Sequence, residues 1–149
     1  MRIYRVFAPM FVCLLLTCTE VVSQGEIIRQ DKSRFEQLHK GKQVSLYTLE
    51  NSNGLLTEIT NFGGKVVSLW VPDRQGKFED VVLGCESLDD YISAKEKYLG
   101  ALVGRYGNRI AKGQFQIDGQ TYTLATNNNE NHLHGGNTGY DAVVWDANQ

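Results

Sequence analysis

Cysteine is scarce in this sequence of 149 residues, which contains three. Two of them, Cys13 and Cys18, lie in the apolar stretch near the N-terminus. Removal of that stretch during export would leave Cys85 alone, so no disulfide framework could form within the mature chain. We therefore expect a hydrophobic core, rather than covalent cross-links, to stabilise the fold.

An excess of positive charge is also missing. The sequence has 15 Lys and Arg residues and 17 Asp and Glu residues, which gives a formal net charge of −2. Proteins that bind nucleic acids or anionic membrane surfaces by electrostatics usually carry basic patches or a basic net charge. We therefore expect neither a nucleic acid nor a membrane surface as a partner of the mature chain.

The first 23 residues have the pattern of a signal peptide. Arg2 and Arg5 precede an apolar run that ends at about Cys18, and small residues follow up to Ser23. The apolar run is shorter than the roughly 20 residues that a membrane-spanning helix needs. We expect cleavage after Ser23 and export to the periplasm or out of the cell.

A lipid anchor is the alternative reading of the same segment. Cys18 would then be the lipid-modified cysteine of a bacterial lipoprotein. Thr17, which precedes it, is a poor match to the small residues that such sites prefer. Only this alternative would place the mature protein at a membrane.

Residues 24–42 are polar, charged and without clear periodicity. This composition is typical of a leader or linker with no more than a frayed helical turn. We expect no function for His39, which lies in this segment. The folded domain is accordingly predicted to cover residues 43–149.

Short segments rich in β-branched and aromatic residues begin at residue 43, as strands require. Turn-forming residues separate them at Asn51–Gly54 and Pro72–Lys77. The Asp118–Gly119 pair marks a later hairpin turn. This spacing predicts an all-β, antiparallel sandwich or barrel. The predicted strands of the first group are residues 43–50, 55–62, 65–72 and 80–84.

One short helix interrupts the β pattern. Ser87 is a suitable N-cap, Asp90 follows three residues later, and lysines lie towards the end of the segment. Roughly 125 residues remain after the signal peptide, which is enough for one small domain but short for a large β-sandwich of about 200–250 residues.

The segment "NNNENHLHGG", residues 127–136, contains two of the three histidines. In a strand, His132 and His134 would place both imidazoles on one face, where zinc could bind. No spacing marks a third ligand, and the surrounding Asn residues favour hydrogen bonding over metal ligation. A polar ligand site is the favoured interpretation, and a surface loop is the simpler alternative. We expect no metal.

The segment "GALVGRYGNRIAKG", residues 100–113, combines two arginines with several glycines that let the backbone approach a ligand closely. It matches neither the phosphate-binding loop nor the dinucleotide-binding pattern. An edge strand with solvated arginines would also fit. The amide of Asn108 beside the guanidinium of Arg109 offers donors and an acceptor that suit the vicinal hydroxyls of a neutral sugar.

The order and spacing of several blocks resemble the N-terminal half of the aldose 1-epimerase, or galactose mutarotase, family. The resemblance covers residues 43–148. The blocks that carry it are "ITNFGGKVVSLWVPDRQGKFEDVVLG", "GRYGNRIAKGQFQIDGQTYTL", "NHLHGG" and "GYDAVVW".

Family members fold as a large antiparallel β-sandwich and interconvert the α and β anomers of free aldoses without a metal or organic cofactor. The resemblance implies that Asn108, Arg109 and His134 contact the sugar, a free aldohexose such as glucose or galactose. His132 has no such role by resemblance.

The family's acid histidine and base glutamate lie well beyond the LHGG block, and no histidine follows His134 here. The resemblance therefore implies a truncated enzyme, with no catalytic residue within these 149 residues and no mutarotation by them alone. Two rival hypotheses are a non-catalytic carbohydrate-binding module and a zinc-binding envelope protein.

Overall fold

The structure, a computed structural model, describes residues 25–148. The predicted signal peptide and the alternative lipid site at Cys18 lie outside these residues. Among the helices that the structure does describe, none has the length and apolar character needed to cross a bilayer. The strands are β1 (Gln37–His39), β2 (Lys42–Val44), β3 (Leu46–Glu50), β4 (Leu56–Thr60), β5 (Lys65–Pro72), β6 (Phe78–Asp80), β7 (Arg109–Ile110), β8 (Gln114–Ile117), β9 (Gln120–Thr123) and β10 (His132–Leu133).

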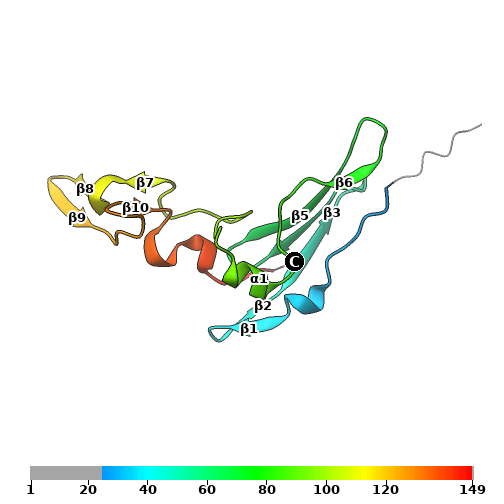
Figure 1. The fold of residues 1–149 in the computed structure, drawn as a ribbon, viewed down its shortest axis with the longest axis horizontal. Coiled ribbons are helices and arrows are strands. Elements are labelled where there is room, and N and C mark those ends of the chain that lie inside the picture. Colours follow the sequence, from blue (N-terminus) through cyan, green and yellow to red (C-terminus); the bar gives the residue numbers. More distant parts are fainter. Residues whose placement is uncertain (1–24, 149) are drawn as a thin grey trace, which may run out of the picture.

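The largest sheet is an antiparallel meander in the order β3-β4-β5-β6. Figure 1 shows this sheet with the helix α1 (Leu88–Ser93) beside it, and the strands β7 to β10 gathered at the far end of the molecule. The predicted antiparallel β architecture is therefore confirmed. The hairpin β8-β9 also forms, and its turn is Asp118–Gly119 as predicted.

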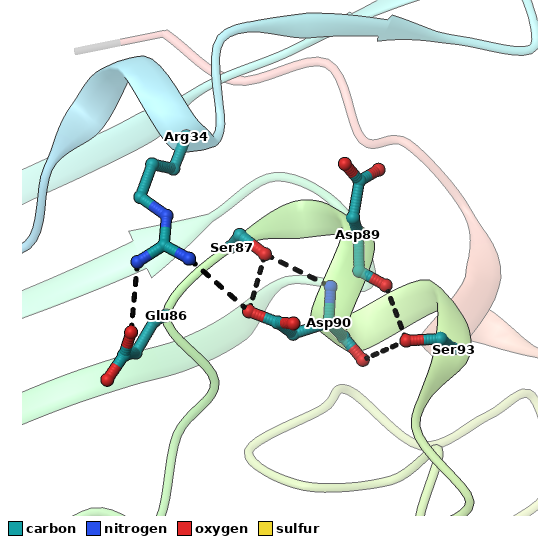
Figure 2. Close-up of polar contacts among 6 residues, drawn as sticks. All are labelled: Arg34, Glu86, Ser87, Asp89, Asp90 and Ser93. Carbon is teal, nitrogen blue, oxygen red and sulfur yellow. Dashed lines mark hydrogen bonds and ion pairs between the residues drawn. The ribbon is translucent and has the colours of Figure 1, made fainter.

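The helix α1 begins where its cap was predicted. The hydroxyl of Ser87 accepts a hydrogen bond from the backbone N–H of Asp90, which satisfies a donor left free by the first turn. Figure 2 shows this cap together with Arg34, which forms ion pairs with Glu86 and Asp90. These pairs are exposed to solvent, so each contributes only about 0–1 kcal/mol to stability.

The expectation that residues 24–42 are a leader or linker with a frayed helical turn is wrong for residues 32–42. A 3₁₀ turn, η1 (Lys32–Arg34), precedes the hairpin formed by β1 and β2. The side chain of Phe35 is fully buried in the main core and packs against Tyr91 with ring centroids 6.5 Å apart. The backbone N–H of Gln30 donates to the buried carboxylate of Glu58 at 3.0 Å.

The main core lies between the large sheet, the helix α1 and this N-terminal segment. Val67 from β5 and Leu88 and Tyr91 from the start of α1 meet there. The complete set of buried core residues is Phe35, Val44, Leu46, Phe62, Val67, Leu88, Tyr91 and Val144.

The strand predicted over residues 80–84 is also wrong, because β6 ends at Asp80. The carboxylate of Asp80 accepts the backbone N–H of Leu69 at 2.9 Å and that of Val82 at 3.0 Å. The backbone N–H of Val81 still donates to the carbonyl oxygen of Leu69 at 3.0 Å, and the side-chain bonds of Asp80 hold the chain where β6 ends. The chain then crosses β5 so closely that a Cβ atom on Gly84 would lie 2.0 Å from the carbonyl oxygen of Val67.

Residues 143–145 bring the chain back to the large sheet. Phe62 forms an isolated antiparallel bridge with Val144. The side-chain amide of Asn61 donates to the carbonyl oxygens of Gln43 and Trp145, both at 3.0 Å. The segment that follows β10 is thus tied to the large sheet.

Candidate functional site

The short pair β7-β10 brings the two predicted sugar-contact segments together. Its antiparallel register places Arg109 opposite Leu133 and Ile110 opposite His132. Asn108 and His134, the next residues outward on the two strands, therefore lie side by side. All three predicted residues, Asn108, Arg109 and His134, meet at this end of the pair.

Asn108 and His134 are joined by two hydrogen bonds. The backbone N–H of Asn108 donates to Nδ1 of the His134 ring at 2.9 Å, and the backbone N–H of His134 donates to the carbonyl oxygen of Asn108 at 3.1 Å. Because Nδ1 accepts a bond, it carries no proton there, and the neutral ring holds its proton on Nε2. The ring therefore presents an N–H donor on its other side.

Both residues have backbone angles that are uncommon outside glycine. The φ angle is 66° at Asn108 and 52° at His134, and Asn and His are among the few side chains that tolerate this region. Such angles persist only where the surroundings impose them, and they are frequent at ligand sites. Here they turn both chains sharply at the end of the β7-β10 pair.

The position after His134 requires glycine for two reasons, its positive φ angle and the lack of room for a side chain. Gly135 has a φ angle of 94°, and a Cβ atom there would lie 1.9 Å from the carbonyl oxygen of Gly104. The carbonyl of Gly104 also accepts the N–H of Tyr140 at 3.1 Å. The glycine-rich segment around Gly104 thus allows close packing of the loop that carries His134.

Arg109 is fixed by amide side chains. Its Nε donates to Oδ1 of Asn128 at 2.9 Å, and one terminal nitrogen donates to Oδ1 of Asn108 at 3.3 Å. A guanidinium has five N–H donors, so donors remain for a ligand. These contacts orient the exposed guanidinium without an ion pair to an acidic residue among residues 25–148.

The Asn-rich run holds the loop, a role that the sequence did not reveal. The side chain of Asn127 donates to the carbonyls of Leu133 and Gly136 and accepts the N–H of Leu133 at 2.8 Å. Asn131 accepts the backbone N–H of Lys112 at 3.1 Å. An Asn side chain carries both donors and an acceptor, which suits it to such bracing.

His132 points away from the polar site. Its side chain is 6% exposed, and its Nδ1 lies 2.9 Å from the carbonyl oxygen of Ala125. His134 lies beyond the end of β10 with a positive φ angle, so the strand spacing that would align the two rings is lost. No three His, Cys, Asp or Glu side chains within residues 25–148 are grouped to hold a metal ion. The absence of zinc stays a prediction.

A hollow of about 770 Å³ lies next to Arg109. Neither Asn108 nor His134 lines it. Most of its wall is apolar or aromatic, with Ile110, Phe115, Leu124 and Tyr140 among its lining residues. Of the three predicted sugar contacts, Arg109 lines this hollow, whereas Asn108 and His134 lie outside it.

One site neighbour was missed by the sequence analysis. The ring of Tyr98 packs edge to face against the imidazole of His134, with centroids 4.7 Å apart and planes at 62°. Tyr98 precedes the glycine-rich segment and carries no recognisable motif. A contact between side chains so distant along the chain gives no local signal.

Comparisons with known proteins identify the family. The sequence model of the family described as aldose 1-epimerase matches residues 45–149. Galactose mutarotase of Bos taurus is 50% identical over 94 residues, which are 63% of this chain and 27% of that protein. Aldose 1-epimerase of Escherichia coli K12 is 36% identical over 105 residues, which are 70% of this chain and 30% of that protein.

Solved structures show the same fold. The aldose epimerase homologue from C. elegans superimposes with a TM-score of 0.65 at 32% identity, covering 71% of this chain and 32% of that one. Galactose 1-epimerase from Lactobacillus acidophilus gives a TM-score of 0.62 at 31% identity, covering 74% and 31%. The chain spans less than a third of each of these four relatives. The match to the family over most of the chain shows that it belongs to the aldose 1-epimerase family, a family of isomerases.

Proposed function

We propose that this chain carries part of the sugar site of a mutarotase that interconverts the α and β anomers of free hexoses such as glucose and galactose. The observation that carries this proposal is the joining of Asn108, Arg109 and His134 by the β7-β10 pair. The site offers neutral and cationic hydrogen-bond donors and amide oxygens, as recognition of an uncharged polyol requires.

Each of the three residues has a distinct part in sugar binding. Arg109 contributes the N–H donors that Asn108 and Asn128 leave free, and these suit two neighbouring hydroxyl oxygens. His134 contributes its Nε2–H group, since Nδ1 is occupied by the backbone of Asn108. Asn108 contributes a side-chain amide whose oxygen already accepts from Arg109.

Anomer exchange proceeds through the open-chain aldehyde. One group removes the proton of the anomeric hydroxyl while another protonates the ring oxygen, so an acid and a base are required. Asn108, Arg109 and His134 hold and orient the ring in this proposal. Proximity and orientation lower the barrier only when the acid and the base are placed against the bound sugar.

Polarimetry on freshly dissolved α-glucose tests the proposal. The complete gene product should speed the approach to anomeric equilibrium in proportion to its concentration. Arg109→Ala should lose most of this acceleration, whereas Arg74→Ala, at an exposed arginine in the β5-β6 turn, should keep it. Sugar binding without any acceleration would favour the non-catalytic carbohydrate-binding module instead.

Export forms a second part of the proposal. It is supported by the basic residues Arg2 and Arg5, the apolar run after them and the small residues up to Ser23. The substrate would then be free sugar in the periplasm or outside the cell.

A further inference from the structure

Tyr98 is a neighbour of the sugar site for which neither the family motif nor the sequence suggests a role. It lies between the helix α1 and the glycine-rich segment, and its side chain is half-buried. Its ring contacts the imidazole of His134 edge to face, at a centroid distance of 4.7 Å. Aromatic pairs with this geometry contribute about 0.5–1.5 kcal/mol beyond the area that they bury.

The backbone on both sides of Tyr98 is anchored to the strand β5. The ammonium group of Lys65, whose side chain is 1% exposed, donates to the carbonyl oxygen of Lys97 at 2.7 Å. The backbone N–H of Val66 donates to the carbonyl oxygen of Gly100 at 3.0 Å. Tyr98 is therefore held by two consecutive residues of the central part of the large sheet.

Lys65 is itself held in a defined place. Its Nζ lies 5.7 Å from the ring centroid of Phe62 and 5.6 Å from that of Tyr91, so two aromatic faces surround the cation. Both rings belong to the main core. The core thus fixes the carbonyl of Lys97, and through the backbone it fixes Tyr98.

The imidazole of His134 needs such support. It lies outside the strand, and among the described residues its ring makes one hydrogen bond, between Nδ1 and the N–H of Asn108. A single bond at one edge still lets the ring tilt about that contact. A ring turned by 180° about Cβ–Cγ would place a carbon where Nδ1 accepts, and the Nε2–H donor would point elsewhere.

We propose that Tyr98 is a positioning residue that fixes the orientation of the His134 imidazole, so that its Nε2–H group faces a sugar hydroxyl. The contact with the sugar rests on the proposed function, whereas the packing of the two rings does not. Burial raises the pKa of Tyr98, and the nearby Asp141 carboxylate raises it further, so the phenol stays neutral near pH 7.

Nitrogen-15 and proton NMR of the histidine side chains in the 149-residue protein tests the positioning. The sequence has only three histidines, and His134→Gln identifies the signals of His134. The parent should show a neutral ring protonated at Nε2 and NOEs between the Tyr98 and His134 ring protons. Tyr98→Phe should preserve the tautomer and the ring-proton shifts, whereas Tyr98→Leu should shift and broaden them.

The affinity of the complete gene product for galactose provides the second measurement. Tyr98→Leu should weaken it by about 2- to 10-fold, the equivalent of one aromatic pair, and Tyr98→Phe should leave it unchanged. An equal loss in both variants would assign the effect to the hydroxyl group and overturn the proposal.

The two measurements separate the positioning from the proposed function. Absence of NOEs between the two rings in the unmodified protein overturns the positioning, even where Tyr98→Leu does not fold. Unchanged His134 signals in a folded Tyr98→Leu variant also overturn it. Signals that change in Tyr98→Leu alone support it, and if the complete gene product then binds no sugar, the proposed function is what fails.

Discussion

Asn108 and His134 hold each other through two hydrogen bonds, one from the backbone of Asn108 to the imidazole and one from the backbone of His134 to the carbonyl of Asn108, at 2.9 and 3.1 Å. The first bond decides which ring nitrogen of His134 keeps the proton. The second continues the β7-β10 pairing by one residue beyond the strand ends. The backbone geometry and the chemistry of the ring are therefore set by the same two residues.

Arg109→Ala and His134→Ala should each weaken binding of galactose or glucose by about 1–3 kcal/mol, because sugar hydroxyls lose their partners in the site. Calorimetric titration of the complete gene product measures this loss. Arg74→Ala is the matched control and should bind as the parent does. Unchanged affinity in both site variants would remove these residues from the sugar site.

Gly135→Ala should destabilise the protein by at least about 2 kcal/mol, because the added Cβ atom would overlap the carbonyl of Gly104 in a left-handed backbone. Gly119→Ala is the control, since that glycine also has a positive φ angle but has no neighbouring atom within 4 Å. It should cost only about 1 kcal/mol. Urea unfolding compares the two, and an equal loss would contradict the close contact at Gly135.

Phe35→Ala should cost about 3–5 kcal/mol of unfolding free energy, the usual cost of emptying a buried aromatic site. Phe35 is fully buried, whereas Leu38 in the adjacent strand β1 is 73% exposed. Leu38→Ala should therefore change stability by less than about 0.5 kcal/mol. If Phe35→Ala were as mild, the N-terminal segment would be a linker after all.

Local features of the fold were predictable because short stretches of sequence determine them. The turn at Asp118–Gly119 needs a glycine at positive φ, and the cap at Ser87 needs a hydroxyl before the first helical turn. Both are visible within a few residues. The pairing of β3, β4 and β5 likewise follows from turn residues between apolar strands.

Long-range features were not predictable in the same way. Phe35 stands alone among polar residues, so its burial depends on the sheet and helix that cover it. Asp80 ends β6 by bonding to Leu69, on the neighbouring strand. In the site, family motifs indicated Asn108, Arg109 and His134, but the ring of Tyr98 acts across the fold.

If the chain is exported as proposed, we expect cleavage after Ser23, because small residues follow the basic start and the apolar run. N-terminal sequencing of secreted or periplasmic material should begin at Gln24. Arg2→Glu with Arg5→Glu should slow export by removing the positive start of the signal. An intact Met1, or a lipid on Cys18, would contradict this cleavage.

The stability of the protein should respond to alkaline pH through Lys65. Burial lowers the pKa of Lys65 below its ordinary value of 10.5, and the nearby Asp141 and Cys85 only partly offset this effect. Between the lowered pKa and 10.5, the unfolded chain binds a proton that the folded chain has released. Stability from this group therefore rises with pH across that window.

Lys65→Met isolates the effect, because it keeps an unbranched side chain that is only one atom shorter and removes the titrating group. Burial raises the pKa of Tyr91, which lowers stability above pH 10, but Tyr91 is present in both proteins. Urea unfolding should be measured in steps from pH 7 to pH 10.5. The unfolding free energy of the parent should rise relative to that of Lys65→Met as the pH increases. If the difference in unfolding free energy between the two proteins stayed constant or fell with pH, the pKa of Lys65 would not be lowered in the folded protein. The contacts of its ammonium group would then fully offset the cost of burial.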